Sequence, residues 1–145
     1  MAQKADLQKN TGPKTGSTTP MHGVGRRKAA VARVWIRRGT GTMTVNGRPV
    51  DQYFPTDLTR AAAQTPFRVC EQARLYDVKV NVCGGGTTGQ ADAVKLGFAR
   101  ALVSNDENLR SILRQHGLLT VDSRVVERKK PGQRGARRKF QFVKR

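Results

Sequence analysis

The stretch YDVKVNVCGGGTTGQADAVKLGFARAL, residues 76–102, carries the clearest structural pattern of the chain. Apolar residues alternate with polar ones over residues 76–82, and this period of two predicts a strand with one buried face. Between Ala91 and Leu102 the apolar residues recur at helical spacing, which predicts an amphipathic helix of about four turns. Three consecutive glycines separate the two patterns, so we expect a strand, a turn and a helix in direct succession.

Shorter elements are predicted upstream of this stretch. The β-branched and aromatic run at residues 31–36 predicts a strand. Residues 42–45 predict a second, short strand that ends in the turn signal Asn46-Gly47. Thr65-Pro66 predicts the start of a helix that continues to Ala73, because proline favours the first helical position.

Downstream, a second helical pattern restarts at Asn105 or Asp106 and runs through Leu113. We expect Gly117 to close this helix in a left-handed conformation. Past Leu119 the apolar period fails, and prolines and glycines argue against another long helix.

These patterns divide the chain into three segments. Residues 1–22 are rich in Thr, Gly, Lys, Gln and Pro without any period, and are predicted to form a disordered arm. Residues 23–120 contain all the predicted elements and suit one globular domain. Residues 121–145 carry ten basic and only two acidic side chains, and are predicted to form an extended basic tail.

The charge of the chain indicates a polyanionic partner. Lys and Arg number 28 against 10 Asp and Glu, which gives a formal net charge of +18, and the isoelectric point is about 11.4. So much self-repulsion destabilises a compact domain unless a polyanion neutralises it. Nucleic acid is favoured over a membrane, because we find neither an amphipathic basic helix nor a lipid anchor nor a run of ~18–20 apolar residues.

Residues of the types used in catalysis and metal binding show no matching pattern. Cys70 and Cys83 lack metal-ligand spacing and are expected to be reduced and buried, as small hydrophobic residues of a cytosolic protein. His22 lies in the predicted arm, and His116 falls in the last turn of a helix, where a capping role is expected. We therefore predict a protein without catalytic activity, metal or cofactor.

The glycine stretch at residues 84–89 literally fits the dinucleotide pattern G-x-G-x-x-G. A dinucleotide fold needs another strand after the helix, whereas here a second helix follows. A P-loop is excluded because Gln90-Ala91 stands where Lys and Ser or Thr are required. Two interpretations remain: the glycines let an RNA phosphate reach the helix start, or they only turn the chain. We also expect Gly86 to need a positive φ and to resist replacement by Val.

Basic residues gather in two clusters. The first is Arg26-Arg27-Lys28, at the entrance to the first predicted strand. The second is the tail, where Phe140 and Phe142 interleave with the charges and so favour RNA over a localisation signal. Its basic residues are Arg124, Arg128, Lys129, Lys130, Arg134, Arg137, Arg138, Lys139, Lys144 and Arg145.

Three collinear stretches together resemble the family of the ninth protein of the small ribosomal subunit, in its bacterial and organellar form. The first lies at residues 25–34. The second comprises residues 84–86, 89–93 and 97–102, and the third residues 117–120 and 126–132 with the terminal Lys144-Arg145. The resemblance covers about residues 23–145. The tip departs from the family pattern, because Lys139, Phe140 and Val143 replace three of its usual residues.

The resemblance implies an α+β domain in which a four-stranded sheet carries helices on one face. It implies a structural, non-catalytic protein of the subunit head, within cytoplasmic ribosomes, which contacts 16S-type ribosomal RNA and neighbouring head proteins and does not form an independent homo-oligomer. It also implies that Lys144 and Arg145 reach the peptidyl-site tRNA. The expected RNA-binding residues are Arg26, Arg27, Lys28, Gly84, Gly85, Gly86, Gln90, Arg128, Lys129, Lys130, Arg134, Arg137, Arg138 and Lys139.

Two other functions remain as alternatives from the sequence. One is a free basic RNA- or DNA-binding module with a flexible arm, which a high-salt wash would strip from ribosomal subunits. The other is a nucleotide-binding enzyme, whose melting temperature a nucleotide would raise.

Overall fold

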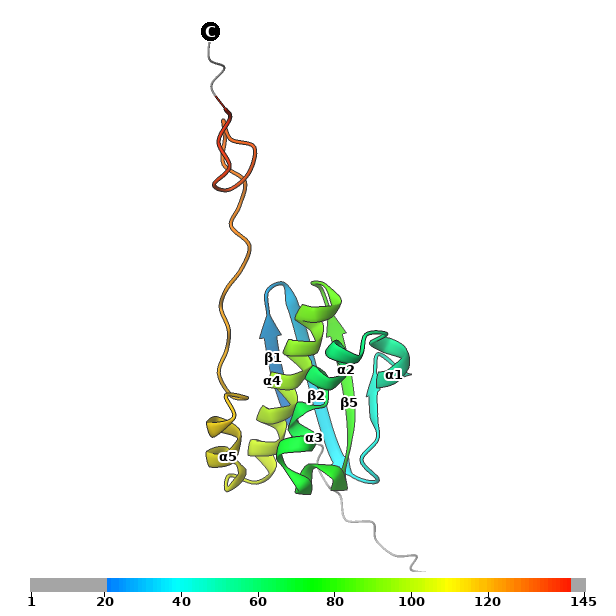
Figure 1. Cartoon of the computed structure of the whole chain (residues 1–145). Coiled ribbons are helices and arrows are strands. Elements are labelled where there is room, and N and C mark those ends of the chain that lie inside the picture. The colour runs from blue at the N-terminus through cyan, green and yellow to red at the C-terminus, as the bar shows by residue number, and fades with distance from the viewer. Residues whose placement is uncertain (1–20, 142–145) are drawn as a thin grey trace, which may run out of the picture.

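The computed structural model of the chain describes residues 21–141 (Figure 1). The disorder predicted for residues 1–20 and the contacts predicted for Phe142, Lys144 and Arg145 lie outside these residues. The elements in chain order are β1 (Met21–Arg27), β2 (Ala30–Arg38), β3 (Met43–Val45), β4 (Arg48–Pro49), α1 (Val50–Tyr53), α2 (Asp57–Ala63), α3 (Thr65–Val69), the 3-10 helix η1 (Glu71–Leu75), β5 (Tyr76–Cys83), α4 (Thr87–Asn105) and α5 (Leu109–Gln115).

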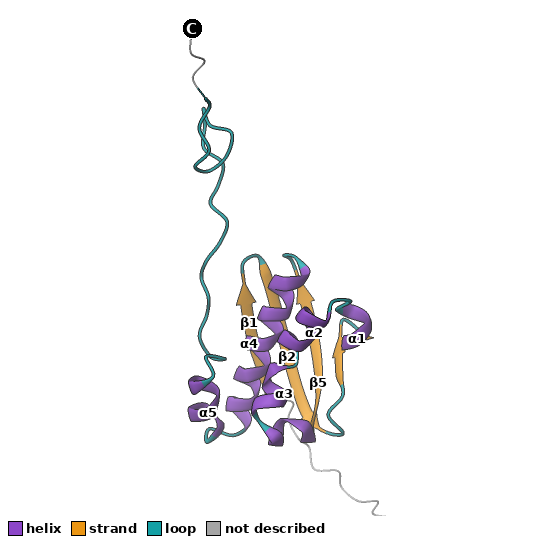
Figure 2. Ribbon diagram, in the orientation of Figure 1, coloured by secondary structure: helices purple, strands orange, loops and turns teal. Residues whose placement is uncertain are grey.

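The strands form one mixed sheet in the order β1-β2-β5-β3-β4. All neighbours are antiparallel except β3 and β5, which run parallel. Buried and exposed residues alternate along β2 and β5, so one face of the sheet is buried, and Figure 2 shows the helices gathered on that side. The predicted α+β class, with helices on one face, is confirmed, as is the strand predicted from residue 76.

The expectation of four strands is wrong, because the sheet has five. The added edge strand β4 follows from the turn at Asn46 and Gly47, whose φ values of 49° and 78° match a two-residue hairpin. This turn pairs Val45 with Arg48 and lays Pro49 against Thr44. Proline has no N–H to donate, so it is compatible only with a short strand at a sheet edge.

Strand β1 was not predicted from the pattern, and it begins inside the expected arm, at Met21. Its core-facing residues Gly23 and Gly25 carry no side chain that a hydrophobic period could reveal. They lie directly against α4: a Cβ at Gly23 would collide with the Gly97 carbonyl, and one at Gly25 with the Ala93 carbonyl. The glycines therefore let the β1 backbone approach the helix closely.

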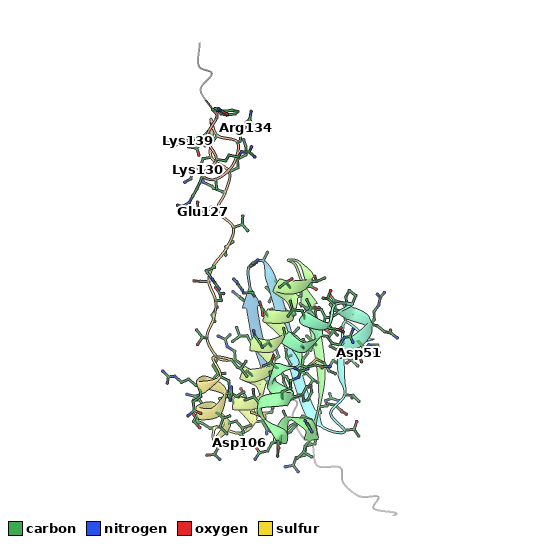
Figure 3. All side chains as sticks on the ribbon, in the orientation of Figure 1. Asp51, Asp106, Glu127, Lys130, Arg134 and Lys139 are labelled. Carbon is green, nitrogen blue, oxygen red and sulfur yellow. The ribbon has the colours of Figure 1, made fainter. Side chains whose placement is uncertain are left out.

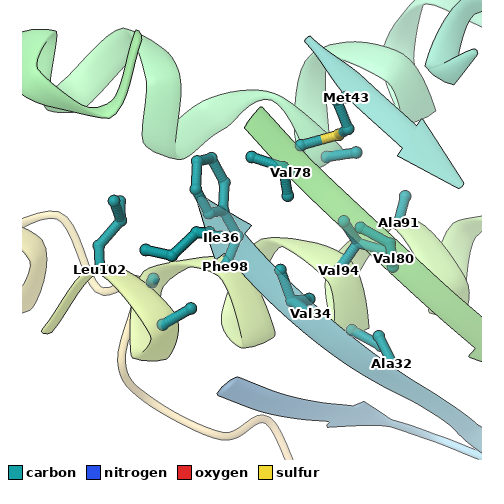
Figure 4. Close-up of a cluster of buried hydrophobic side chains, with 14 of the residues drawn as sticks. Ala32, Val34, Ile36, Met43, Val78, Val80, Ala91, Val94, Phe98 and Leu102 are labelled. Atoms are coloured by element: carbon teal, nitrogen blue, oxygen red, sulfur yellow. The ribbon is translucent and has the colours of Figure 1, made fainter. Parts of the chain in front are cut away.

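Helix α4 is the centre of the core (Figure 4). It is longer than predicted, with 19 residues, of which ten are buried. Phe98 and Leu102 are fully buried, and in Figure 4 the Phe98 ring lies beside Ile36 while Val94 lies near Val34 and Val80. The helix is buried beyond a single stripe because α2 and α3 contact it in addition to the sheet.

The region after α4 ends the domain. Helix α5 closes as predicted at Gly117, which has a φ of +67°. The Gly117 N–H donates to the Arg114 carbonyl and the Leu118 N–H to the Leu113 carbonyl, both at 3.0 Å, which is a Schellman cap. Beyond this cap the chain leaves the domain and extends past the end of the sheet (Figure 1). Within residues 21–141, no helix is long and apolar enough to cross a membrane.

Candidate nucleic-acid interface

The glycine turn between β5 and α4 has two residues in the left-handed region. Gly84 has a φ of +71° and Gly85 a φ of +67°. Gly86 does not share this conformation, since its φ is −99° and a Cβ placed there would have no heavy atom within 4 Å. The expectation that Gly86 needs a positive φ is therefore wrong, and the conformational requirement belongs to the two glycines before it.

The first turn of α4 is open to solvent. Gly86 is the residue before the helix, and no side chain caps the helix start. Gly86, Thr87 and Thr88 are all exposed. Backbone N–H groups without intrahelical partners at such an end favour an anion, and Gly86 adds no side chain to block one.

A chain of side-chain hydrogen bonds holds this turn in place. The Tyr53 hydroxyl donates to Gln90 Oε1 at 2.9 Å, and Gln90 Nε2 donates to the Gly84 carbonyl at 3.1 Å. Asn46 adds a second brace, since its amide donates to the Val82 carbonyl and accepts from the Val82 N–H. Both polar atoms of the Gln90 amide are thus used inside the protein, and Gln90 fixes the shape of the glycine turn.

The predicted cluster Arg26-Arg27-Lys28 lies beside the glycine turn. Lys28 has a φ of 53° in the turn between β1 and β2. A Cβ added to Gly84 would meet the Ala29 carbonyl, and one added to Gly85 would lie 2.9 Å from the Ala30 N atom. The structure therefore brings two predicted sites together at one end of the sheet, with Arg26 and Lys28 exposed there. We call residues 26–28 and 84–88 the basic end.

Arg27 differs from its two neighbours, because its side chain is only 13% exposed. Its guanidinium lies 2.9 Å from the Asp122 carboxylate and 3.8 Å from that of Asp92. It also donates to the backbone carbonyls of Asp122 and Arg124, at 3.3 and 2.6 Å. Arg27 thus ties the start of the tail to β1 and α4.

The Asp122 carboxylate lies between two arginines, Arg27 and Arg124. Hydrogen bonds from the Arg124 side chain, and then from the Arg124 backbone N–H, hold the pKa of Asp122 far below its usual value, and the charge of Arg27 acts in the same direction. The carboxylate therefore stays ionised and keeps both arginines at the root of the tail.

The far part of the tail forms a turn that we call the tail loop, residues 127–140. Arg137 pairs with Glu127 at 2.6 Å and lowers the pKa of that carboxyl through hydrogen bonding. The Arg138 carbonyl accepts from the Arg134 N–H at 2.9 Å, and the Arg134 guanidinium lies 5.3 Å from the centre of the Phe140 ring. Figure 3 shows Glu127, Lys130, Arg134 and Lys139 clustered at this loop, away from the domain.

Most of the tail's predicted RNA-binding side chains are unpaired. Six exposed basic residues in the tail loop make no ion pair with any described residue: Arg128, Lys129, Lys130, Arg134, Arg138 and Lys139. Arg137 is the exception because of Glu127. The predicted tRNA-binding residues Lys144 and Arg145 lie outside the described residues.

Sequence reasoning missed two features. The Arg27–Asp122 pair joins residues 95 apart, and no local pattern signals such a contact. The second feature is the face of the sheet opposite the helices, which we call the open face. The alternation of Arg33, Trp35 and Arg37 with the buried residues of β2 could have revealed it. It carries His22, Arg33, Trp35, Arg37, Thr44 and Lys79.

No metal site is found among the described residues, where no three His, Cys, Asp or Glu side chains gather closely enough to hold an ion. Cys70 is buried, as expected, and burial raises the pKa of its thiol. Cys83 is exposed, contrary to the expectation for a small hydrophobic residue, because it takes the open-face side at the end of β5.

Comparison with known proteins identifies the family. The family model described as "Ribosomal protein S9/S16" matches residues 25–145. The small ribosomal subunit protein uS9 of Chlorobium chlorochromatii (strain CaD3) is 54% identical over 122 residues, which cover 84% of this chain and 95% of that protein. The chain therefore belongs to the ribosomal protein S9 family, as a structural, non-enzymatic protein of the small ribosomal subunit.

Proposed function

We propose that this protein binds 16S-type ribosomal RNA in the head of the small subunit, and that the end of its tail contacts the peptidyl-site tRNA. The basic end supplies the contacts of the domain: Arg26 and Lys28 meet phosphates directly, and one further phosphate docks at the open start of α4 beside Gly86. Gln90 acts on this binding indirectly, by bracing the glycine turn.

The tail supplies the larger electrostatic contribution. The observation that carries the proposal is the position of the unpaired basic residues, which project from the domain on a chain anchored at its root by Arg27. Phosphates contribute most of the affinity of RNA-binding proteins, and an extended basic segment can reach several of them. The tail thus runs between RNA segments while the domain rests on their surface.

In this role the protein lies inside cytoplasmic ribosomes, next to other proteins of the head. It does not form a homo-oligomer of its own. Its tRNA contact is assigned to Lys144 and Arg145, the last two residues of the chain. The described part of the tail supports this assignment, because Lys130, Arg134 and Lys139 already lie beyond the end of the sheet (Figure 3).

The salt dependence of RNA binding tests the proposal. Each neutralised phosphate contributes roughly −0.7 to −0.9 to the slope of log K against log salt. Deleting residues 124–145 removes ten basic side chains and should flatten that slope by several units. The matched control replaces Arg68, Arg74 and Arg114, which are exposed on the helical side, by Gln and should leave the slope nearly unchanged. An unchanged slope after the tail deletion would contradict the assignment of the tail to RNA.

A further inference from the structure

The open face is uncovered in the described part of the chain. Residues from four strands align across it, with His22 opposite Trp35, Trp35 opposite Lys79, and Lys79 opposite Thr44. His22, Thr44 and Lys79 are exposed, and Trp35 is half-buried. An aromatic side chain therefore lies in the middle of a polar sheet surface, where it contributes little to the hydrophobic core on the other side.

Trp35 borders a hollow in this surface. Its ring is tilted by 39° against His22, with 5.2 Å between the ring centres. On the other side lies a hollow of about 560 Å³, whose lining includes Trp35, Arg37, Thr44 and Lys79. A flat ring that lines an open hollow is suited to stacking against another flat group.

The charge around Trp35 is strongly positive. Arg33 and Arg37 lie two positions away from it along β2, and Lys79 lies directly across on β5. All three are exposed, and none pairs with an acidic side chain among residues 21–141. The one carboxylate nearby, Asp77, is already engaged, since its Oδ1 accepts hydrogen bonds from the N–H and hydroxyl groups of Thr40 and Thr42.

We propose that the open face is a second RNA-binding surface, which holds an unpaired segment of ribosomal RNA with one base stacked on Trp35. Arg33, Arg37 and Lys79 bind the phosphates on either side of that base. Aromatic rings flanked by cations are the combination with which proteins hold single-stranded RNA. A protein partner fits this face less well, because three cations surround Trp35 and charged residues are depleted at the core of protein–protein interfaces.

This inference rests on the proposed function and adds a distinct surface to it. Trp35 is the only tryptophan of the chain, so its fluorescence reports on this surface alone. The full chain is titrated with a transcript of the 16S-type RNA head domain, and binding is followed both by filter retention and by Trp35 emission. We expect emission to be quenched in step with retention.

Two sets of variants test the contacts. The triple variant Arg33→Gln, Arg37→Gln, Lys79→Gln should flatten the salt slope by about two to three units. The control triple variant Arg68→Gln, Arg74→Gln, Arg114→Gln removes the same charge from the helical side. It should leave the salt slope nearly unchanged. Trp35→Ala should weaken binding by about five- to a hundredfold, whereas Trp35→Phe, which keeps a ring, should retain most of the affinity. Thermal melting of each variant establishes that the domain remains folded.

The outcomes separate this inference from the proposed function. RNA retention with unchanged Trp35 emission and an unchanged slope in the first triple variant would overturn this inference alone. Quenching that requires neighbouring head proteins, and not RNA, would assign the face to a protein and would also overturn it. A full chain without any affinity for the transcript would instead refute the proposed function.

Discussion

The guanidinium of Arg27 lies 2.9 Å from the carboxylate of Asp122, so a residue of β1 holds the first residues of the tail. The same guanidinium donates to the Arg124 carbonyl at 2.6 Å. A tail attached only through the covalent chain after α5 would leave in many directions, whereas this contact restricts where it leaves the domain. Arg27 is therefore a positioning residue for the tail, although its sequence neighbours Arg26 and Lys28 are exposed.

Replacing Arg27 by Gln should release the root of the tail and leave the domain folded. We expect the heteronuclear NOE values of residues 122–126 to fall toward those of a free chain, because the ion pair and two hydrogen bonds are lost together. Arg110→Gln, which removes the exposed pair with Glu107, is the matched control and should change nothing in this segment. Unchanged NOE values in Arg27→Gln would show that the tail is held by other contacts.

The same contact predicts how the tail responds to pH. The pKa of Asp122 is depressed in the folded protein, mainly by Arg124, so its contribution is fully present above the unfolded value of about 3.9 and is lost as pH falls below it. The NOE values of residues 122–126 should therefore stay constant from pH 8 to pH 5 and decline only in more acidic solution. Asp122→Asn should be insensitive to pH over the whole range. A loss of order between pH 7 and pH 5 would point to a histidine instead.

An element of this fold can be predicted from the sequence only where its side chains recur at a regular spacing or stand at a diagnostic position. Strand β5, helix α4 and the cap at Gly117 were predicted because their apolar and glycine residues stand at diagnostic positions. Strand β1 was not, because Gly23 and Gly25 fill its buried positions with backbone alone. The basic clusters were visible as charge, but only the fold distinguishes half-buried Arg27 from exposed Arg26.

The glycine turn offers a pair of matched substitutions. Gly85→Ala should destabilise the domain by about 1–2 kcal/mol, because it forces an L residue to a φ of +67° beside Ala30. For a domain of this size, that corresponds to a fall in melting temperature of about 4–8 °C per kcal/mol. Gly86→Ala meets no neighbour and should stay within about 0.5 kcal/mol of the original protein. Equal melting temperatures for the two variants would contradict the assignment of the conformational requirement to Gly85.

Replacing Gly86 by a bulkier residue tests the phosphate site at the start of α4. Gly86→Val is not expected to strain the backbone, since the φ of Gly86 is −99°. Its branched side chain should nevertheless keep a phosphate from the N–H groups of the first helical turn. We expect RNA affinity to fall at an unchanged melting temperature. If both quantities are unchanged, the glycines only turn the chain.

The last two residues should matter for tRNA and not for assembly. A charge-assisted hydrogen bond to phosphate contributes ~1.5–3 kcal/mol, so losing one weakens binding roughly ten- to a hundredfold. Deleting Lys144 and Arg145 should therefore leave small subunits intact on a sucrose gradient while lowering their affinity for peptidyl-site tRNA. The matched control, Lys129→Gln with Lys130→Gln, removes the same charge from the tail loop and should weaken ribosomal RNA binding instead. Low magnesium makes the test most sensitive, because fewer ions can then compensate for the lost charges. Unchanged tRNA affinity under those conditions would limit the tail to ribosomal RNA.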